Sequence, residues 1–477
     1  MFFNSLAFAI FLPLVFILYW FVFNKTKRTQ NAVLIIASYY FYSCWDWRFL
    51  FLLVFSTFLD YYTGIRIEKS KTKKISKFWF WLSISVNLGF LGIFKYYNFF
   101  ANSFAELLTG VGFKASPFLL DVVLPVGISF YTFHGLSYVI DIYYKRIKAE
   151  YNFVDYSLFV SYFPLLVAGP IERATHLLPQ VKVKRTFDSD RAKEGIHQFI
   201  WGLLKKVVIA DTCATYANAI FDNYPSMNSL SLILGAVYFA FQIYGDFSGY
   251  SDMALGMSKL FGIDLLKNFN YPYFSRDIAE FWRRWHISLT TWFRDYLYIP
   301  LGGSKGGIWM KIRNTFIIFL VSGFWHGANW TYMAWGFINA VYFLPLLLSN
   351  KNRNNIEAVQ LKWNFYSVKV ILSIIYTFLL TCVAWVFFRA KTINDAILYL
   401  KRIILTRNFS LQYLDNDRYN YELLLMIGLF VLVEWNNRFK IEPISGKRSV
   451  LKLALAIASI MAFGTFSNYK EFIYFQF

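Results

Sequence analysis

Residues 6–23 read LAFAIFLPLVFILYWFVF, an apolar run without a charged side chain. A helix needs about 20 predominantly apolar residues to cross the hydrocarbon core of a bilayer, so this run is long enough to span it. Lys25, Lys27 and Arg28 follow the run, and no small-residue cleavage site comes after it. We therefore interpret it as a retained membrane anchor and not as a signal peptide.

Similar apolar runs recur along the rest of the chain. Runs shorter than about 17 residues are typical of re-entrant or broken helices, whose backbone polar groups must be satisfied by protein or by a water-filled cavity. The sequence therefore predicts an all-α polytopic membrane protein that forms one domain, residues 1–477, around a cavity. The further candidate spans are Ala32–Trp45, Phe49–Ile65, Phe78–Phe99, Leu119–Tyr143, Ile196–Phe221, Leu230–Tyr244, Thr315–Trp325, Trp330–Leu348, Val368–Phe388, Leu423–Trp435 and Val450–Phe466.

Composition agrees with a membrane protein. The chain is 57% hydrophobic and only 16% charged, whereas an average soluble domain is about 45–50% apolar and 25% charged. The formal charge of +20 comes from lysines and arginines that collect in short segments between the apolar runs, as in the positive-inside pattern. No basic stripe lies on a soluble domain, so nucleic acid is excluded as a partner. The three scattered cysteines indicate neither a disulfide framework nor a zinc site.

The most polar stretch between the spans is FWRRWHISLTTWFRDYLYIP, residues 281–300. Its alternation of polar and aromatic residues predicts an amphipathic helix near the membrane interface. At helical spacing, one stripe of that helix carries Arg283, His286, Thr290 and Arg294. The alternative interpretation is a purely interfacial helix with snorkelling arginines and an aromatic belt.

A second histidine lies in GFWHGANW, residues 323–330, directly after an apolar run. An ionisable residue at the end of a span is costly and predicts a functional site. Burial disfavours the imidazolium, so we expect His326 to be neutral near pH 7 and able to accept a proton. Trp325 and Asn329 flank it as candidate substrate contacts. A structural histidine is the alternative interpretation.

The third polar stretch, YGDFSGYSD, covers residues 244–252 at the end of an apolar run, with Gln242 just before it. Asp246 and Asp252 need partners in a membrane, and we expect Arg283, Arg284 or Arg294 to supply them. Ser248 does not lie in the GxSxG pattern of a nucleophile elbow. These residues predict either substrate contacts or a buried ion-pair cluster that holds helices together.

Taken together, these segments resemble the membrane-bound O-acyltransferase (MBOAT) family, and within it the branch that acetylates alginate. The resemblance implies a bundle of about 11 or more transmembrane and re-entrant helices around a central funnel. It also implies that His286 and His326 are the family's two histidines, with His326 as the catalytic one. The stretches that carry the resemblance are Leu124–Phe133, Phe163–Ile171, Asp246–Asp252, Asn268–Tyr273, Phe281–Gly303, Phe324–Gly327 and Phe472–Phe477.

Members of this family move an acetyl or other acyl group from a cytosolic thioester, such as acetyl-CoA, toward an exported polysaccharide. The resemblance thus implies a multi-pass protein of the bacterial inner membrane, without a bound cofactor, that works with a periplasmic SGNH-type acetyltransferase. His326 would be general base or nucleophile, His286 would orient substrate or stabilise an oxyanion, and the nearby arginines would hold donor phosphates. Two alternatives stay open: D-alanyl transfer to a teichoic acid-like polymer, and a transporter or flippase.

Overall fold

The computed structural model is helical, and the part of the chain that it describes contains no β-strand. It describes residues 1–477 except 114, 122, 167–168, 358, 360–364, 411, 413–420, 441–443, 447, 467–471 and 474–477. Two of the stretches that carry the family resemblance, Phe163–Ile171 and Phe472–Phe477, therefore lie partly outside the described residues. The all-α class predicted from the sequence is confirmed, and the number of crossings stays a prediction.

The chain divides into two compact units. The first comprises Met1–Gly195 and Met257–Leu266. Its α-helices are α1 (Leu6–Ile17), α2 (Lys27–Ser43), α3 (Arg48–Glu68), α4 (Lys73–Leu91), α5 (Tyr97–Gly110), α6 (Ile128–Tyr143), α7 (Phe153–Ser161), α8 (Phe163–Leu166) and α9 (Ala174–Val181), with π-helical turns η1 (Leu18–Val22) and η2 (Gly92–Tyr96).

The second unit comprises Ile196–Gly256 and Lys267–Phe477, and it contains every candidate site residue. Helices α10 (Ser189–Leu204) and α12 (Ser229–Leu260) each have one end in the first unit. The other elements are η3 (Lys205–Ala210), α11 (Asp211–Asp222), η4 (Tyr224–Ser226), η5 (Pro272–Phe274), α13 (Ile278–Arg284), α14 (Ile287–Phe293), η6 (Arg294–Tyr298), α15 (Ile308–His326), α16 (Trp330–Leu348), α17 (Phe365–Arg389), α18 (Ile393–Thr406), α19 (Glu422–Asn437) and α20 (Ser449–Phe463).

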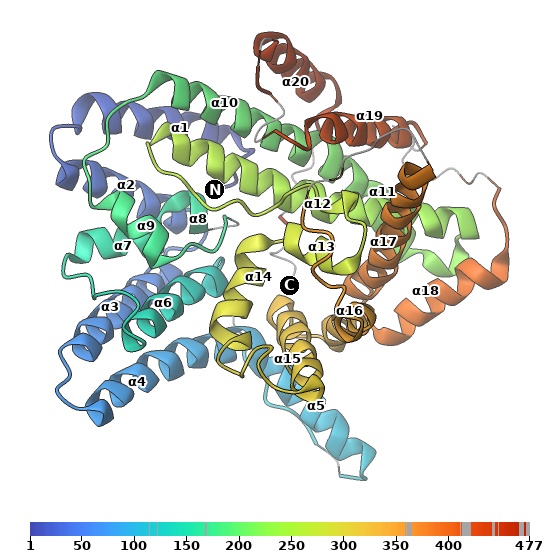
Figure 1. Cartoon of the computed structure of the whole chain (residues 1–477), viewed down its shortest axis with the longest axis horizontal. Coiled ribbons are helices and arrows are strands. Elements are labelled where there is room, and N and C mark those ends of the chain that lie inside the picture. Colours follow the sequence, from blue (N-terminus) through green and yellow to red (C-terminus); the bar gives the residue numbers. More distant parts are fainter. Residues whose placement is uncertain are drawn as a thin grey trace. The chain divides into compact units, whose positions relative to one another are not determined.

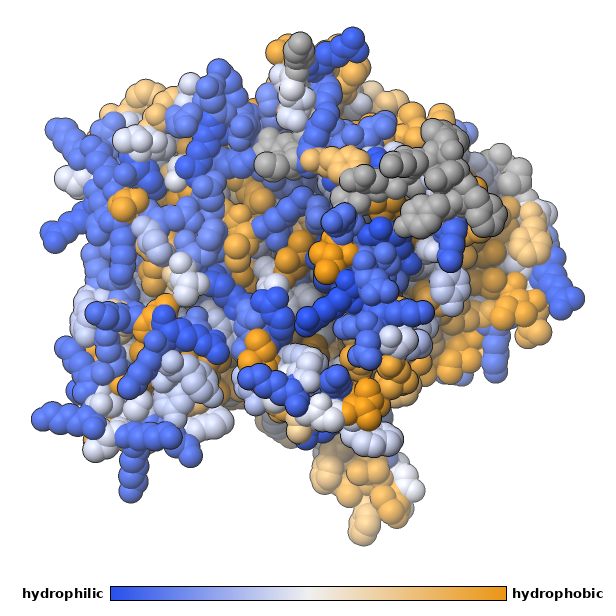
Figure 2. All heavy atoms as spheres, viewed as in Figure 1, coloured by the Kyte–Doolittle hydropathy of each residue, from blue (hydrophilic) through white to orange (hydrophobic). Residues whose placement is uncertain are grey.

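Among the described residues, five helical segments are long and apolar enough to cross a membrane: Arg48–Glu68, Lys73–Gly110, Ser229–Leu260, Trp330–Leu348 and Ser367–Arg389. Shorter apolar helices cover Leu6–Val22 and Ser449–Phe463. Large hydrophobic side chains are exposed on several of these helices, as the membrane interpretation requires. Figure 2 shows such hydrophobic surface at α5 and α18, next to faces covered by hydrophilic residues. The protein is a multi-pass membrane protein.

Several predicted spans have other bounds in the structure, and two of these differences change how the chain is interpreted. The span Leu119–Tyr143 is helical only from Ile128, because Gly127 adopts a positive φ of 73° and α6 begins after it. The span Leu230–Tyr244 is too short, since α12 continues without a break to Leu260. Asp246 and Asp252 therefore lie within a long helix and not at its end.

An aromatic core joins the helices of the second unit near the two histidines. Trp335 of α16 stacks on Trp385 of α17, with 5.7 Å between ring centroids and an interplanar angle of 18°. Trp285, which follows α13, lies 5.1 Å from Trp385. All three indoles are fully buried. Burial of such large rings contributes strongly to folding, and here it fixes α13, α16 and α17 around the site.

Candidate functional site

His326 is the last residue of α15, and the structure buries it in an aromatic pocket. Its imidazole lies edge-to-face with Trp335 at 5.1 Å and with Phe388 at 5.3 Å between ring centroids. The helix ends there because the next residue, Gly327, is fully extended. His326 is 4% exposed, so its imidazole is largely shielded from bulk water.

Two glycines let α15 and α16 approach closely, and Figure 1 shows these helices side by side. A Cβ on Gly323 would lie 2.2 Å from the backbone oxygen of Tyr332. A Cβ on Gly336 would lie 2.3 Å from the backbone oxygen of Phe319. Small residues at such a crossing are typical of packed membrane helices. The contact fixes the end of α15 and therefore the position of His326.

The helix predicted over residues 281–300 is interrupted at His286. Helix α13 ends at Arg284, and Trp285 is extended. His286 has φ 42° and ψ 55°, a left-handed conformation that is uncommon outside glycine and asparagine. Helix α14 then begins at Ile287. The single helical stripe of Arg283, His286, Thr290 and Arg294 predicted from helical spacing is therefore wrong, because the helix breaks at His286. Arg283, Thr290 and Arg294 nevertheless line one cavity.

Asn268 holds the strained histidine in place. The backbone N–H of Ile287 donates to the carbonyl of Asn268 at 2.9 Å, and that of Asn270 donates to Arg284 at 3.0 Å. These two bonds tether the chain on both sides of His286. The Asn268 side chain adds a third contact, since its Oδ1 lies 3.0 Å from Nδ1 of His286.

The same contacts define the tautomer of His286. The Ser288 hydroxyl donates to Asn268 Oδ1 at 2.9 Å, and the Ser288 backbone N–H approaches that atom at 3.4 Å. A backbone N–H only donates, so the asparagine atom that faces both residues is the oxygen. Nδ1 of His286 must therefore carry the hydrogen, and Nε2 carries the lone pair.

His286 is also held in its neutral form. It lies outside the long apolar helices and is only 1% exposed. Burial lowers the pKa of His286 to about 3, because the charged imidazolium loses its hydration there. Near neutral pH the residue is thus an uncharged imidazole whose Nε2 can accept a hydrogen bond.

Trp325 connects the two histidines. Its ring centroid lies 6.1 Å from that of His286 and 4.9 Å from that of His326. Phe247 of α12 completes this environment with an edge-to-face contact to His286 at 4.5 Å. The two histidines predicted as a pair therefore come together around one buried indole, although they are far apart in the sequence.

A cavity of about 490 Å³ lies between α13–α14 and α15–α16. On α15 it is lined by Thr315, Phe319 and Ser322, and His326 follows Ser322 by one helical turn on the same face. On α14 it is lined by Thr290, whose backbone N–H donates to the carbonyl of His286 at 3.0 Å. The walls of this cavity on α14 and α15 are thus close in the chain to the two histidines, although neither imidazole is among its lining residues.

The three predicted arginines have different surroundings. Arg283 and Arg294 line the cavity, together with Arg353. Arg283 donates to the backbone carbonyls of Asn352 and Asn355 at 2.7 and 2.8 Å. The Arg294 side chain is exposed and pairs with Asp295. A bound anion can therefore reach Arg294 directly.

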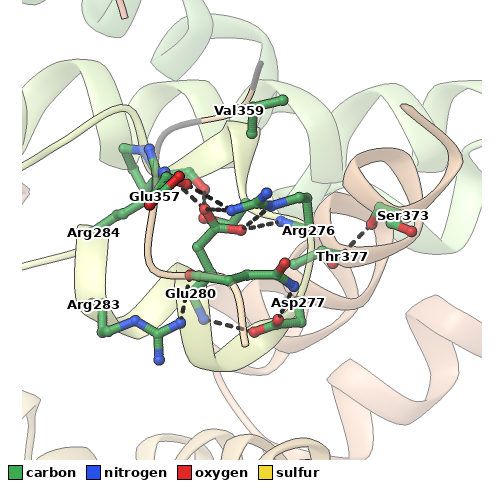
Figure 3. Close-up of polar contacts among 12 residues, drawn as sticks. Arg276, Asp277, Glu280, Arg283, Arg284, Glu357, Val359, Ser373 and Thr377 are labelled. Carbon is green, nitrogen blue, oxygen red and sulfur yellow. Dashed lines mark hydrogen bonds and ion pairs between the residues drawn. The ribbon is translucent and has the colours of Figure 1, made fainter. Parts of the chain in front are cut away.

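Arg284 is committed to a buried ion pair. Figure 3 shows Glu280 between Arg276 and Arg284, with Arg283 directed elsewhere. The Glu280 carboxylate lies 3.0 Å from Arg276 and 2.7 Å from Arg284. Glu280 is 1% exposed, so removing either cation would leave a poorly compensated buried charge. Arg284 therefore has a structural role, as a partner of the buried Glu280.

The predicted arginine partners of Asp246 and Asp252 are wrong. Asp246 pairs with Lys206 at 2.7 Å, and Lys206 also reaches Asp211 at 2.8 Å. Asp252 pairs with Lys205 at 2.9 Å. Both lysines lie in η3, a π-helical segment, and such segments are frequent at functional sites. The result is the buried ion-pair cluster that the sequence left as the second interpretation.

The remaining predicted residues occupy polar positions around the core. The Ser248 hydroxyl accepts from Lys205 at 3.3 Å. Gln242 is buried on α12. Asn329 caps α16, since its Oδ1 accepts from the backbone N–H of Thr331 at 3.0 Å. Ser248 and Asp252 also line a small polar pocket that extends to Asn268.

Sequence reasoning missed Lys205, Lys206, Asn268 and Glu434. Lys205 also lies 3.4 Å from Glu434, which accepts a hydrogen bond from Tyr244 at 2.8 Å. Two adjacent lysines inside the predicted span Ile196–Phe221 are a signal that could have revealed this cluster, because charges within a span need partners. The contact between Asn268 and His286 has no comparable signal, because it depends on the tertiary fold.

Comparison with known proteins gives a consistent result. The model of the family described as MBOAT, membrane-bound O-acyltransferase family, matches residues 142–388. The chain is 41% identical to the "Probable alginate O-acetylase AlgI" of Pseudomonas aeruginosa, over 81% of this chain and 71% of the relative. It is 35% identical to the peptidoglycan O-acetyltransferase of Helicobacter pylori, over 85% and 80%. It is 28% identical to the teichoic acid D-alanyltransferase of Bacillus subtilis, over 56% and 69%.

Proposed function

The chain belongs to the membrane-bound O-acyltransferase family, and from this premise we propose that His326 and His286 carry its acyl transfer. The protein is a membrane O-acyltransferase for the O-acetylation of an exported polysaccharide. The O-acetylases named above are more similar to the chain, and over more of its length, than the D-alanyltransferase. These likenesses favour acetyl over D-alanyl as the group transferred.

The observation that carries this proposal is the convergence of the two buried imidazoles on Trp325. A large cavity lies next to the helices α14 and α15 that hold them. A water-poor site protects a thioester from hydrolysis and strengthens the polar interactions of the reacting groups. Histidine is the side chain that most often serves as a general base, and it does so in its neutral form.

In the proposed reaction, a new bond forms between the thioester carbonyl carbon and an attacking atom, and the carbon–sulfur bond breaks. If the attacking atom is the acceptor hydroxyl oxygen, His326 takes its proton and returns a proton to the departing thiolate. If His326 itself attacks, a transient acyl-imidazole forms and then passes the acyl group to the hydroxyl. General-base help of this kind contributes about 10²–10⁴-fold.

His286 acts as a hydrogen-bond acceptor in this reaction. With the hydrogen on Nδ1 and the lone pair on Nε2, its outer nitrogen is suited to orient a hydroxyl group by accepting from it. This tautomer does not suit Nε2 to donate to an oxyanion, the other role expected from the sequence. The Trp325 indole contacts both imidazoles and thereby fixes the distance between them.

We propose acetyl-CoA as the acyl donor. Arg283 and Arg294 line the cavity, and guanidinium groups are well suited to phosphate oxygens. Arg294 is the stronger candidate, because its side chain is exposed and its partner Asp295 lies at the surface. Arg284 supports the site indirectly through Glu280.

We further propose that the protein lies in a bacterial inner membrane and hands its acyl group to a periplasmic SGNH-type acetyltransferase, which completes transfer to the polymer. The sequence resemblance supports this arrangement. Co-purification of the two proteins from the same membrane tests it, and polymer acetylation that persists without any periplasmic acetyltransferase would contradict it.

The test of the reaction itself uses the purified chain in nanodiscs with acetyl-CoA labelled in the acetyl group. We expect release of free CoA and labelled acetate or product, with loss of at least about 100-fold in His326→Ala. A transporter or flippase would move substrate without cleaving the thioester. Wild-type protein that leaves the thioester intact in the presence of acceptor and partner would contradict the proposed donor.

A further inference from the structure

A second large cavity, of about 450 Å³, lies away from the two histidines. We call this cavity the groove. The residues of α19 that line it are spaced three and four positions apart, and so are those of α20. Each helix therefore presents one face to the groove. Trp201 and Leu204 of α10 form its third wall. The lining residues from the two other helices and their loop are Val433, Asn436, Asn437, Lys440, Ile444, Lys452, Leu455, Ala456 and Ser459.

Polarity changes along this groove. Lys440 follows the end of α19, and Lys452 lies in the first turn of α20, so both ammonium groups lie near the loop that joins the two helices. Asn436 and Asn437 are next to Lys440. Farther from the loop, the walls are formed mainly by Leu204, Val433, Leu455 and Ala456. The groove is therefore cationic at one end and mainly apolar along the rest.

No carboxylate occurs among the described residues that line the groove. Val433 and Leu455 are 40% and 60% exposed, and α20 is one of the short apolar helices of this membrane protein. In a bilayer, acyl chains cover such apolar walls, and basic residues at the end of an apolar helix attract anionic lipid headgroups.

We propose that this groove binds one anionic glycerophospholipid, with its phosphate between Lys440 and Lys452 and its acyl chains along α10, α19 and α20. The apolar walls select an amphiphile over free phosphate. The two ammonium groups select an anionic headgroup over a zwitterionic one, whose own cation would lie beside the lysines.

The position of the groove gives the lipid a structural role. Trp201 lines the groove and also the small polar pocket that extends to Asn268. Its ring stacks with Phe430 of α19 at 5.9 Å between centroids. A lipid in the groove would therefore brace α10 against α19 at Trp201, the residue that also lines that pocket.

Native mass spectrometry of the full chain tests the proposal. The protein is purified in a neutral detergent and titrated with phosphatidylglycerol, with phosphatidylcholine of the same acyl chains, and with glycerol phosphate, which has no acyl chains. The test variant is Lys440→Gln/Lys452→Gln. The matched control is Lys369→Gln/Lys401→Gln, which removes two exposed lysines from α17 and α18.

We expect one phosphatidylglycerol to bind more tightly than phosphatidylcholine. Each basic residue near an anionic lipid contributes about 1 kcal/mol, so the test variant should lose roughly tenfold or more of the phosphatidylglycerol affinity while the control retains it. Equal affinity for the two lipids, or equal loss in the control, would overturn the proposal. Displacement of the lipid by glycerol phosphate at similar concentration would show a phosphate site and also overturn it.

Discussion

The backbone at His286 lies in a left-handed conformation that is uncommon for any residue other than glycine. Such strain of about 1–3 kcal/mol persists only where neighbouring groups enforce it, and it is frequent at functional sites. Here the neighbouring group is Asn268, which tethers the chain around His286 and accepts the hydrogen of its Nδ1. One asparagine thus fixes the position and the tautomer of the imidazole, while burial keeps it uncharged.

Replacing Asn268 with aspartate tests this control by pH. In the wild type the pKa of His286 is about 3, so the residue stays neutral from pH 5 to pH 8 and adds no acidic limb to the rate profile. A carboxylate beside Nδ1 favours the imidazolium and raises the pKa of His286. We expect Asn268→Asp to keep activity at high pH and to lose it as the pH falls and His286 becomes protonated.

The control is Asn268→Leu, which removes the acceptor and leaves Nδ1 without its partner. We expect this variant to lose at least about tenfold of activity at every pH, because the useful tautomer is no longer enforced. The measurement is kcat/KM for the thioester between pH 5 and pH 9. Identical pH profiles for the wild type and Asn268→Asp would contradict the assigned contact.

At the scale of elements, the contact between α15 and α16 places His326. Gly323 and Gly336 face backbone oxygens at distances that leave no room for a Cβ. We expect Gly323→Ala to push the helices apart, to destabilise the protein by about 1–3 kcal/mol and to reduce activity through the displaced histidine. Thermal unfolding in detergent and thioester turnover check this.

The matched control is Gly428→Ala, also in an apolar helix. A Cβ at Gly428 would meet no atom within 4 Å, and alanine favours a helix over glycine by up to about 1 kcal/mol. We expect unchanged or slightly increased stability and unchanged turnover. Equal destabilisation by the two substitutions would show that the close helix approach has no special role.

The elements also show what the sequence could predict. Apolar length alone placed α16 at Trp330–Leu348 and predicted α3 and α17 closely. It failed where the backbone depends on contacts distant in sequence. The break at His286 requires pairing with Asn268. The start of α6 depends on a left-handed glycine at 127, where a Cβ would lie 2.1 Å from the backbone oxygen of Leu166.

The candidate site was predictable in part for the same reason. A histidine at the end of an apolar run is unusual in itself, so His326 could be selected from the sequence. The two adjacent lysines in the predicted span Ile196–Phe221 indicate a buried cluster, but a linear pattern does not show which carboxylate each lysine meets. The π-helical segment η3 directs the adjacent Lys205 and Lys206 to different carboxylates, those of Asp252 and Asp246.

At the scale of the whole molecule, the buried cluster around Lys206 joins distant parts of the second unit. Lys206 pairs with Asp246 of α12 and Asp211 of α11. Asp246 also accepts the backbone N–H of Ile473 at 2.7 Å, so the cluster reaches the C-terminal segment. Removing the cation leaves two buried carboxylates without this partner.

We therefore expect Lys206→Met to destabilise the protein by about 3–5 kcal/mol. The control is Lys193→Met, because Lys193 pairs with Asp190 on the surface, where an ion pair contributes about 0–1 kcal/mol. Chemical denaturation followed by helix content measures both changes. A Lys206→Met protein as stable as the control would mean that the cluster does not hold the unit together.

The account as a whole depends on acyl transfer at His326. The most direct measurement is the O-acetyl content of the exported polysaccharide in cells that carry the wild-type chain, His326→Ala or His197→Ala, with equal protein in the membrane. The account predicts a loss of at least about 100-fold in His326→Ala and full acetylation in His197→Ala, whose histidine lies on α10 outside the described cavities. Wild-type acetylation in His326→Ala would contradict it.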